Sequence, residues 1–161
     1  MFTDMVGYTA MAQADEGAAL AALERHNRLL RPLFSKFHGR EIKTVGDAFL
    51  VAFDSTLDAV HCAIEIQRAL ASYNAELPGA ERTQVRIGVH VGDVVRRRGD
   101  LLGDTVNLAS RLESLNKEMG STLLVSDTVR QVAGDALGDA VALGPIAVRG
   151  YAEPVTVWRL A

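Results

Sequence analysis

Residues 41–53 read EIKTVGDAFLVAF, and this stretch decides the fold class. Residues 41–45 and the apolar run 48–53 are predicted as two strands, and they flank the dipeptide Gly46-Asp47, which is a tight-hairpin signal. Apolar residues at helical spacing precede the hairpin over residues 15–37 and follow it over residues 55–73. Helices and strands therefore alternate while neighbouring strands pair as hairpins, which favours an α+β sandwich over a doubly wound parallel sheet.

The rest of the chain extends this pattern on both sides of the hairpin. A third helix follows Gly103 and runs to Met119. A short arm begins at Val94, with its exposed turn at residues 96–99. Pro32 predicts a kink or break in the first helix. Further strands are expected over residues 1–6, 84–91, 122–125, 140–148 and 155–160, with a short helix over 127–132. The apolar stripe expected for the first helix is Leu20, Leu23, Leu30, Leu33, Phe34 and Phe37.

Size and composition limit the function classes. The 161 residues are 48% hydrophobic and 23% charged, with a net charge of -3, which fits one globular domain and disfavours a nucleic-acid partner. The chain has no run of 18 apolar residues and no signal peptide, and Cys62 is its only cysteine. We therefore expect a cytoplasmic domain over residues 1–161 without membrane contact of its own. Its opening strand has no lead-in, as in a domain excised from a longer protein.

Two carboxylates stand where a metal ligand would be expected. Asp4 lies on an otherwise apolar strand just before a glycine turn, and Asp47 lies at the tip of the hairpin. The ordinary alternatives are a turn or helix cap for Asp4 and a hairpin turn residue for Asp47. If their strands are neighbours, the two carboxylates converge, as the oxygen ligands of a hard divalent cation would.

Other polar residues could meet a phosphate, a sugar or a base. Asn107 and Arg111 are four residues apart and share one face of the third helix, which suits a phosphate or sugar, although a solvated face is the simpler interpretation. Lys43 lies in a strand, and four extended residues separate it from Asp47 by roughly 13 Å, so the two can serve different parts of a site. Asp100 ends the arm, and Arg149 is a cation at a strand end.

Four motifs together resemble the class III nucleotidyl cyclase catalytic domain over nearly the whole chain. In order, they are FTDMVGYT at residues 2–9, KTVGDAF at 43–49, RIGVH at 86–90 and GDTVNLASR at 103–111. The resemblance implies the family's ferredoxin-like cyclase fold, an α+β fold with a mostly antiparallel central sheet flanked by helices. It implies conversion of ATP to cyclic AMP and pyrophosphate.

The resemblance also implies roles for the matched positions. Asp4 and Asp47 are similar to the family's metal-binding aspartates, which hold two divalent cations, Mg²⁺ or Mn²⁺. The other matched positions are Lys43 and Asp100 for the purine, Asn107 for the ribose, Arg111 for the transition state, and Arg149 where the family commonly has a triphosphate-binding lysine. Family members place metal aspartates and base-reading residues on different subunits, so a homodimer with composite sites is implied.

The base-reading pair favours ATP over GTP. Lys43 can donate to adenine N1 and Asp100 can accept from the N6 amino group, whereas guanine presents the opposite pattern at both positions. A guanylate cyclase is the close alternative. A regulatory pseudo-cyclase that binds nucleotide without turnover is the non-enzyme alternative. The signature of diguanylate cyclases is absent, which places that class well behind.

Overall fold

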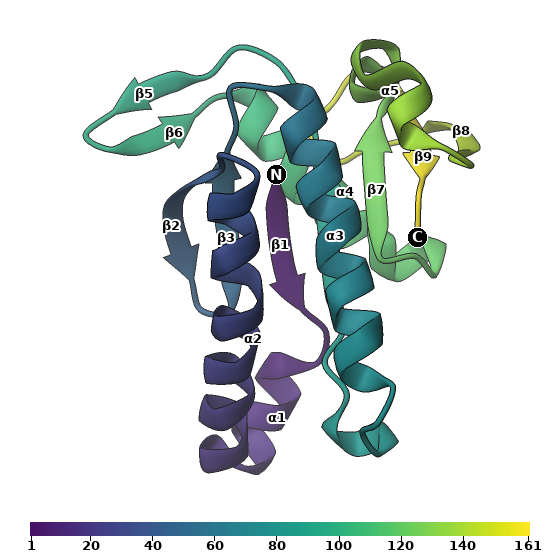
Figure 1. Ribbon diagram of the computed structural model, residues 1–161. Helices are drawn as coiled ribbons and strands as arrows, with labels where there is room; N and C mark the ends of the chain where they lie inside the picture. The colour runs from purple at the N-terminus through teal and green to yellow at the C-terminus, as the bar shows by residue number, and fades with distance from the viewer.

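A seven-stranded sheet forms the centre of the protein in a computed structural model, which describes residues 1–161 (Figure 1). Helices α2 and α3 cover one face of this sheet, and α4 covers the other. In sheet order the strands are β2 (Arg40–Val45), β3 (Ala48–Ala52), β1 (Phe2–Met5), β4 (Val85–Val89), β7 (Leu123–Ser126), β9 (Val155–Arg159) and β8 (Val141–Ile146). The helices are α1 (Tyr8–Ala14), α2 (Glu16–Lys36), α3 (Thr56–Asn74), α4 (Asp104–Met119) and α5 (Asp127–Ala133), with 3-10 turns η1 (Gly79–Glu81) and η2 (Gly134–Leu137).

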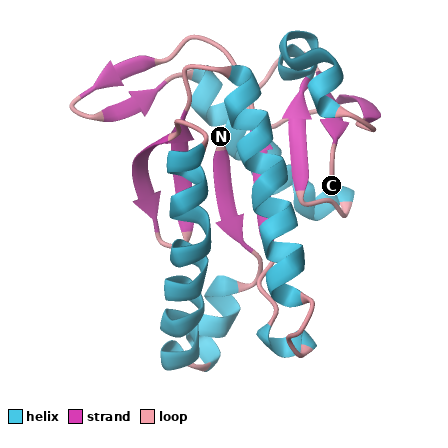
Figure 2. Cartoon of the chain, viewed as in Figure 1, coloured by secondary structure: helices cyan, strands magenta, loops and turns pink.

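The sheet topology confirms the predicted fold class. The first four main-sheet strands and their helices follow the β-α-β-β-α-β order of a ferredoxin-like unit, with strand order β2-β3-β1-β4. All neighbouring pairs are antiparallel except β4 with β7. A separate hairpin of β5 (Val95–Arg97) and β6 (Asp100–Leu102) projects away from the main sheet, as Figure 2 shows. The fold is thus α+β with a mostly antiparallel central sheet flanked by helices.

Three local predictions are corrected by the structure. Helix α2 continues through Pro32 without a break, because this residue is exposed and water can satisfy the carbonyl that the missing N–H leaves free. Arg96 and Arg97 lie in β5, and the turn is Arg98-Gly99, whose φ angles of 50° and 83° suit a two-residue hairpin turn. Helix α1 was not predicted, because it is short and buries no residue.

The buried face of α2 also differs from the predicted stripe. Leu20 is 53% exposed, whereas Ala19, Ala22 and His26 are the buried residues in the first half of the helix. Leu30 and Phe34 continue this face, as predicted for the second half. The first half of α2 lies beside α1 (Figure 1), a helix that the sequence pattern did not predict, and this neighbour accounts for burial of small side chains there.

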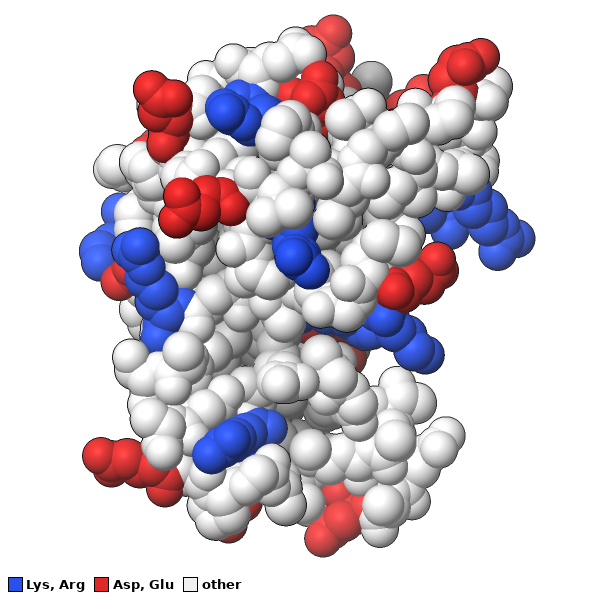
Figure 3. Space-filling view, turned by 90° about the vertical axis from the view of Figure 1, so that its right-hand side faces the viewer, with Lys and Arg blue, Asp and Glu red and all other residues white.

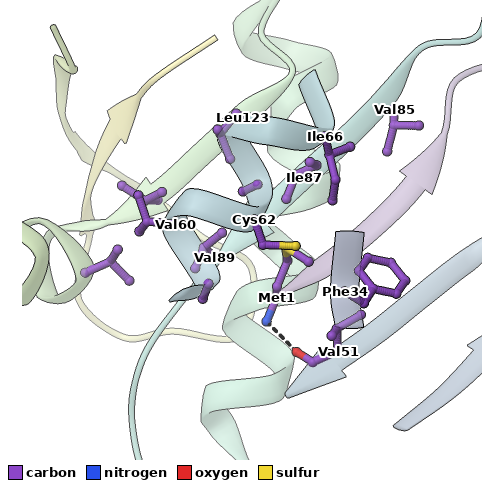
Figure 4. Close-up of a cluster of buried hydrophobic side chains, with 14 of the residues drawn as sticks. Met1, Phe34, Val51, Val60, Cys62, Ile66, Val85, Ile87, Val89 and Leu123 are labelled. Carbon is purple, nitrogen blue, oxygen red and sulfur yellow. Dashed lines mark hydrogen bonds between the residues drawn. The ribbon is translucent and has the colours of Figure 1, made fainter. Parts of the chain in front are cut away.

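The core lies between the sheet and helices α2 and α3. Figure 4 shows side chains of both helices and of the sheet meeting there, including Phe34 of α2, Ile66 of α3 and Ile87 of β4. The same view shows the Met1 ammonium donating to the Val51 carbonyl at 3.0 Å. The ends of β1 are therefore held between β3 and β4, which fixes the strand that carries Asp4.

Two surface properties bear on partners. On the face in Figure 3, basic and acidic side chains are interspersed, without the continuous basic surface typical of a nucleic-acid interface. None of the helices combines the length and the apolar character that crossing a bilayer requires.

Candidate active site

The two aspartates converge at one end of β1. Asp4 is on β1, and Asp47 follows Gly46 in the turn between β2 and β3, where a φ of 62° at Gly46 allows the tight hairpin. Because β3 pairs directly with β1, this turn lies beside the end of β1, and Met5 N–H donates to Asp47 Oδ2 at 2.8 Å. The convergence expected for neighbouring strands is confirmed.

The proximity of the two carboxylates changes the acidity of Asp47. Partial burial, followed by the negative charge of Asp4, raises the pKa of Asp47 to about 6. Two carboxylates that disfavour each other's ionisation are the environment in which a divalent cation binds well, since the cation relieves their repulsion.

Arg86 connects Asp4 to helix α4. Its Nη2 donates to Asp4 Oδ2 at 2.8 Å, and its Nε lies 3.0 Å from Glu113 Oε1. Only 6% of the Glu113 side chain is exposed, and burial, then the charge of Asp4, raises the pKa of Glu113 to about 7. Arg86 is thus the cation that partly balances the acidic groups when no ligand is bound.

Gly88 explains how α4 comes so close to the sheet. An ideal Cβ at Gly88 would lie 2.2 Å from the Ala109 carbonyl oxygen and 2.3 Å from the Glu113 nitrogen. Only glycine permits this approach, and Gly88 lies two residues after Arg86, on the same face of β4. The close contact sets Glu113 directly beside Arg86.

An open cleft of about 420 Å³ lies in front of the aspartates. It is lined by the segment from Asp4 to Ala10 together with Asp47, Arg86 and Lys117. No group of three or more His, Cys, Asp and Glu side chains in the protein could hold a metal ion by itself. Two carboxylates still fit Mg²⁺, which commonly takes one or two protein carboxylates and completes its shell with water and substrate phosphates.

Lys43 and Asp100 form a second polar group, away from the aspartates. Lys43 Nζ donates to Asp100 Oδ2 at 2.6 Å, joining β2 to the projecting hairpin across 57 residues of sequence. This contact holds the pKa of Asp100 below its ordinary value. Both side chains are more than a third exposed. The prediction that Lys43 and Asp47 serve different places agrees with these partners, because Asp47 bonds Met5 instead.

Asn107, Arg111 and Arg149 are exposed, and their side chains make no hydrogen bond or ion pair within the chain. Asn107 and Arg111 share one face of α4, as predicted. Six residues separate Asn107 from Glu113, which turns a helix by about 600° and leaves the two about 120° apart. The structure therefore directs Asn107 and Arg111 away from the cleft that holds the aspartates of the same chain.

Three residues in or directly behind this cleft were missed by sequence reasoning. Arg86 was noted only as part of a motif. Its charge within an otherwise apolar strand was the signal that could have identified it. Glu113 and Lys117 are four residues apart on α4 and were not singled out, because a carboxylate and a lysine on a helix ordinarily mark a solvated face.

The sequence is similar to a family of known proteins along its whole length. The family model described as "Adenylate and Guanylate cyclase catalytic domain" matches residues 1–161. A candidate adenylate cyclase 3 of Rhizobium meliloti (strain 1021) is 36% identical over 157 residues, which is 96% of this chain and 26% of that protein. An adenylate cyclase of Anabaena cylindrica is 34% identical over 146 residues, 80% of this chain and 29% of that protein. The chain thus spans about a quarter of the length of these relatives.

A solved structure supports the same assignment. The adenylate/guanylate cyclase/hydrolase of Silicibacter pomeroyi matches with a TM-score of 0.83 and 34% identity, covering 97% of this chain and 90% of that one. Sequence and fold agree along the whole chain, so the protein belongs to the adenylate and guanylate cyclase catalytic domain family.

Proposed function

We propose that this domain is an adenylate cyclase, a lyase that converts ATP to 3′,5′-cyclic AMP and pyrophosphate. The observation that carries the choice of ATP is the contact of Lys43 Nζ with Asp100 Oδ2 at 2.6 Å. One donor and one acceptor side by side match the N1 acceptor and N6 donor of adenine. Guanine would oppose donor to donor and acceptor to acceptor, at a cost of about 1–3 kcal/mol for each unsatisfied group.

Asp4 and Asp47 are the proposed ligands of two divalent cations, Mg²⁺ or Mn²⁺. When bound, these ions would activate the attacking oxygen and neutralise phosphate charge. In the reaction, the ribose 3′-oxygen forms a bond to the α-phosphorus, the bond from that phosphorus to the β-phosphate oxygen breaks, and the 3′-hydroxyl proton is released. To bind a divalent cation, Asp4 would give up its hydrogen bond from Arg86, which would free the Arg86 Nη2 donor inside the cleft.

The remaining residues act from the second subunit of a homodimer. Asn107 would orient the ribose, Arg111 would stabilise charge that develops at the α-phosphate, and Arg149 would hold the triphosphate. Their exposure, their lack of partners and their direction away from the aspartates of the same chain support composite sites at a two-fold interface. We place this reaction in the cytoplasm, where the single buried Cys62 would remain reduced.

Turnover with ATP and with GTP, each with Mg²⁺ and with Mn²⁺, tests the proposal over a range of protein concentration. We expect cyclic AMP as the main product and a specific activity that falls on dilution. Asp47→Asn is the matched inactive control. Cyclic GMP as the main product would establish the guanylate alternative, and nucleotide binding without any product would establish the pseudo-cyclase.

A further inference from the structure

Lys117 is a cation in the aspartate cleft that has no partner in the protein. The chain has three lysines. Lys36 lies 3.6 Å from Glu65 and Lys43 lies 2.6 Å from Asp100, whereas no carboxylate oxygen lies within 4.0 Å of Lys117. Lys117 is exposed and lines the cleft together with Asp4, Asp47 and Arg86.

The backbone that carries Lys117 is rigidly attached to the sheet. Its neighbour Asn116 is fully buried and donates to the Ile87 carbonyl oxygen at 2.9 Å. Asn116 also accepts from Ser121 Oγ at 2.8 Å, beyond the end of the helix. The last turn of α4 therefore cannot move freely, and the lysine side chain alone decides how far the ammonium group reaches.

The charges of the cleft leave a role for this cation. Asp4, Asp47 and Glu113 are acidic. Arg86 contacts Asp4 and Glu113, and no cation contacts Asp47. A triphosphate brings about four further negative charges at neutral pH, and two divalent cations would carry about four positive ones. The negative charge that the carboxylates hold in excess of Arg86 would then remain. A desolvated phosphate needs close donors, and an ammonium group supplies three of them.

Its place in the cleft assigns Lys117 to the outer phosphates. Glu113, one helical turn earlier, sits deep beside Arg86, and Lys117 is four residues further toward the end of α4. The residues proposed to act at the α-phosphate and at the base reach this site from the second subunit and so do not occupy this edge of the cleft. The β- and γ-phosphates, which leave as pyrophosphate, are therefore the part of the ligand that a side chain at this edge would meet.

We propose that Lys117 binds the β- and γ-phosphates of the nucleotide, and the pyrophosphate product, in the site formed by the aspartates of its own chain. This inference rests on the proposed function and adds to it a substrate-binding residue. The simpler alternative is that Lys117 only complements the negative end of the α4 dipole, as basic residues in a last helical turn commonly do. A purely structural lysine would change melting temperature and leave phosphate affinity unaltered.

Direct binding separates the two roles. Titration calorimetry would measure Mg²⁺-pyrophosphate and, separately, adenosine, which has no phosphate, against the wild-type chain, Lys117→Gln, Lys117→Arg and the control Lys36→Gln. We expect Lys117→Gln to bind pyrophosphate about tenfold more weakly, the size of one charge-assisted hydrogen bond, with adenosine affinity unchanged. Lys117→Arg should stay within about threefold of the wild type, because it keeps the charge.

Each outcome decides between the proposals. Equal pyrophosphate affinity of Lys117→Gln and the wild type would overturn the role of Lys117, whether or not the melting temperature changes. The same weakening in Lys36→Gln would overturn it too, by showing an effect of overall charge. If the wild type turns over ATP and Lys117→Gln binds pyrophosphate as tightly as the wild type, the proposed function stands and the role of Lys117 falls. If the wild type binds no pyrophosphate and produces no cyclic nucleotide, both proposals fail.

Discussion

Replacing Gly88 by alanine should move α4 and thereby displace Glu113, which contacts Arg86, and the pair Asn107 and Arg111. The added Cβ would lie 2.2 Å from the Ala109 carbonyl oxygen, where ordinary van der Waals contact begins at 3.4 Å. Both nearest atoms belong to the α4 backbone, so no side-chain rotation relieves the clash. The helix must retreat by about 1 Å, a distortion that overpacked cores show at a cost of about 1–3 kcal/mol. For a protein of this length, each kcal/mol lowers the melting temperature by about 2–4 °C.

The loss of activity should exceed the loss of folded protein. Helix α4 carries Glu113, which contacts Arg86, and also Asn107 and Arg111, so one displacement disturbs the metal cleft and the proposed transition-state residues together. A misplacement of about 1 Å can cost about a hundredfold in rate. We therefore expect kcat per folded molecule to fall by about that factor at a temperature well below the melting point.

Thermal melting by circular dichroism and cyclase turnover on the same samples would test this reasoning. Gly17→Ala is the matched control, because the nearest atom to its added Cβ is 3.4 Å away and its backbone is helical. This control should keep wild-type turnover and gain up to about 1 kcal/mol of stability. Wild-type melting and turnover in Gly88→Ala would refute the close approach of α4. Reduced stability with normal kcat would refute its link to the site.

Four further predictions concern the site. Because burial and Asp4 raise the pKa of Asp47 to about 6, protons compete with the cation below that pH, so Mg²⁺ affinity measured by titration should fall about tenfold per pH unit there. The same raised pKa means that ionised Asp47 lowers the free energy of unfolding above pH 6, and that this loss of stability is relieved as the pH falls from 6 toward 4. Asp47→Asn should therefore melt no lower than the wild type at pH 8, and a lower melting temperature would contradict this. Lys43→Glu combined with Asp100→Gly should shift the ratio of kcat/KM values from ATP toward GTP, and an unchanged ratio would remove both residues from base recognition. Asp47→Ala and Arg111→Ala should each be inactive, yet their mixture should regain roughly a quarter of wild-type activity by random pairing, and no rescue despite proven subunit exchange would exclude composite sites.

Local patterns in the sequence were sufficient for most of the elements and for the fold class. Gly46-Asp47 between two predicted strands identified the β2–β3 hairpin correctly, and the helical spacing after Gly103 predicted α4 to its last residue. These features depend on the side chains and turn residues of a few neighbouring positions, which is why they can be read without the rest of the molecule. The chemical types at Asp4, Asp47 and Lys43 were equally visible.

The partners of those residues were decided only by the tertiary structure. Arg86 reaches Asp4 across 82 residues of sequence, and Lys43 reaches Asp100 across 57. Both contacts depend on which strands become neighbours in the sheet, and periodicity within one element carries no information about that order. The burial of Glu113 and the opening of Lys117 into the aspartate cleft have the same origin, since both follow from the approach of α4 to β4 at Gly88. The sequence alone thus determined which chemical groups and elements are present, and long-range packing decided which of these groups meet.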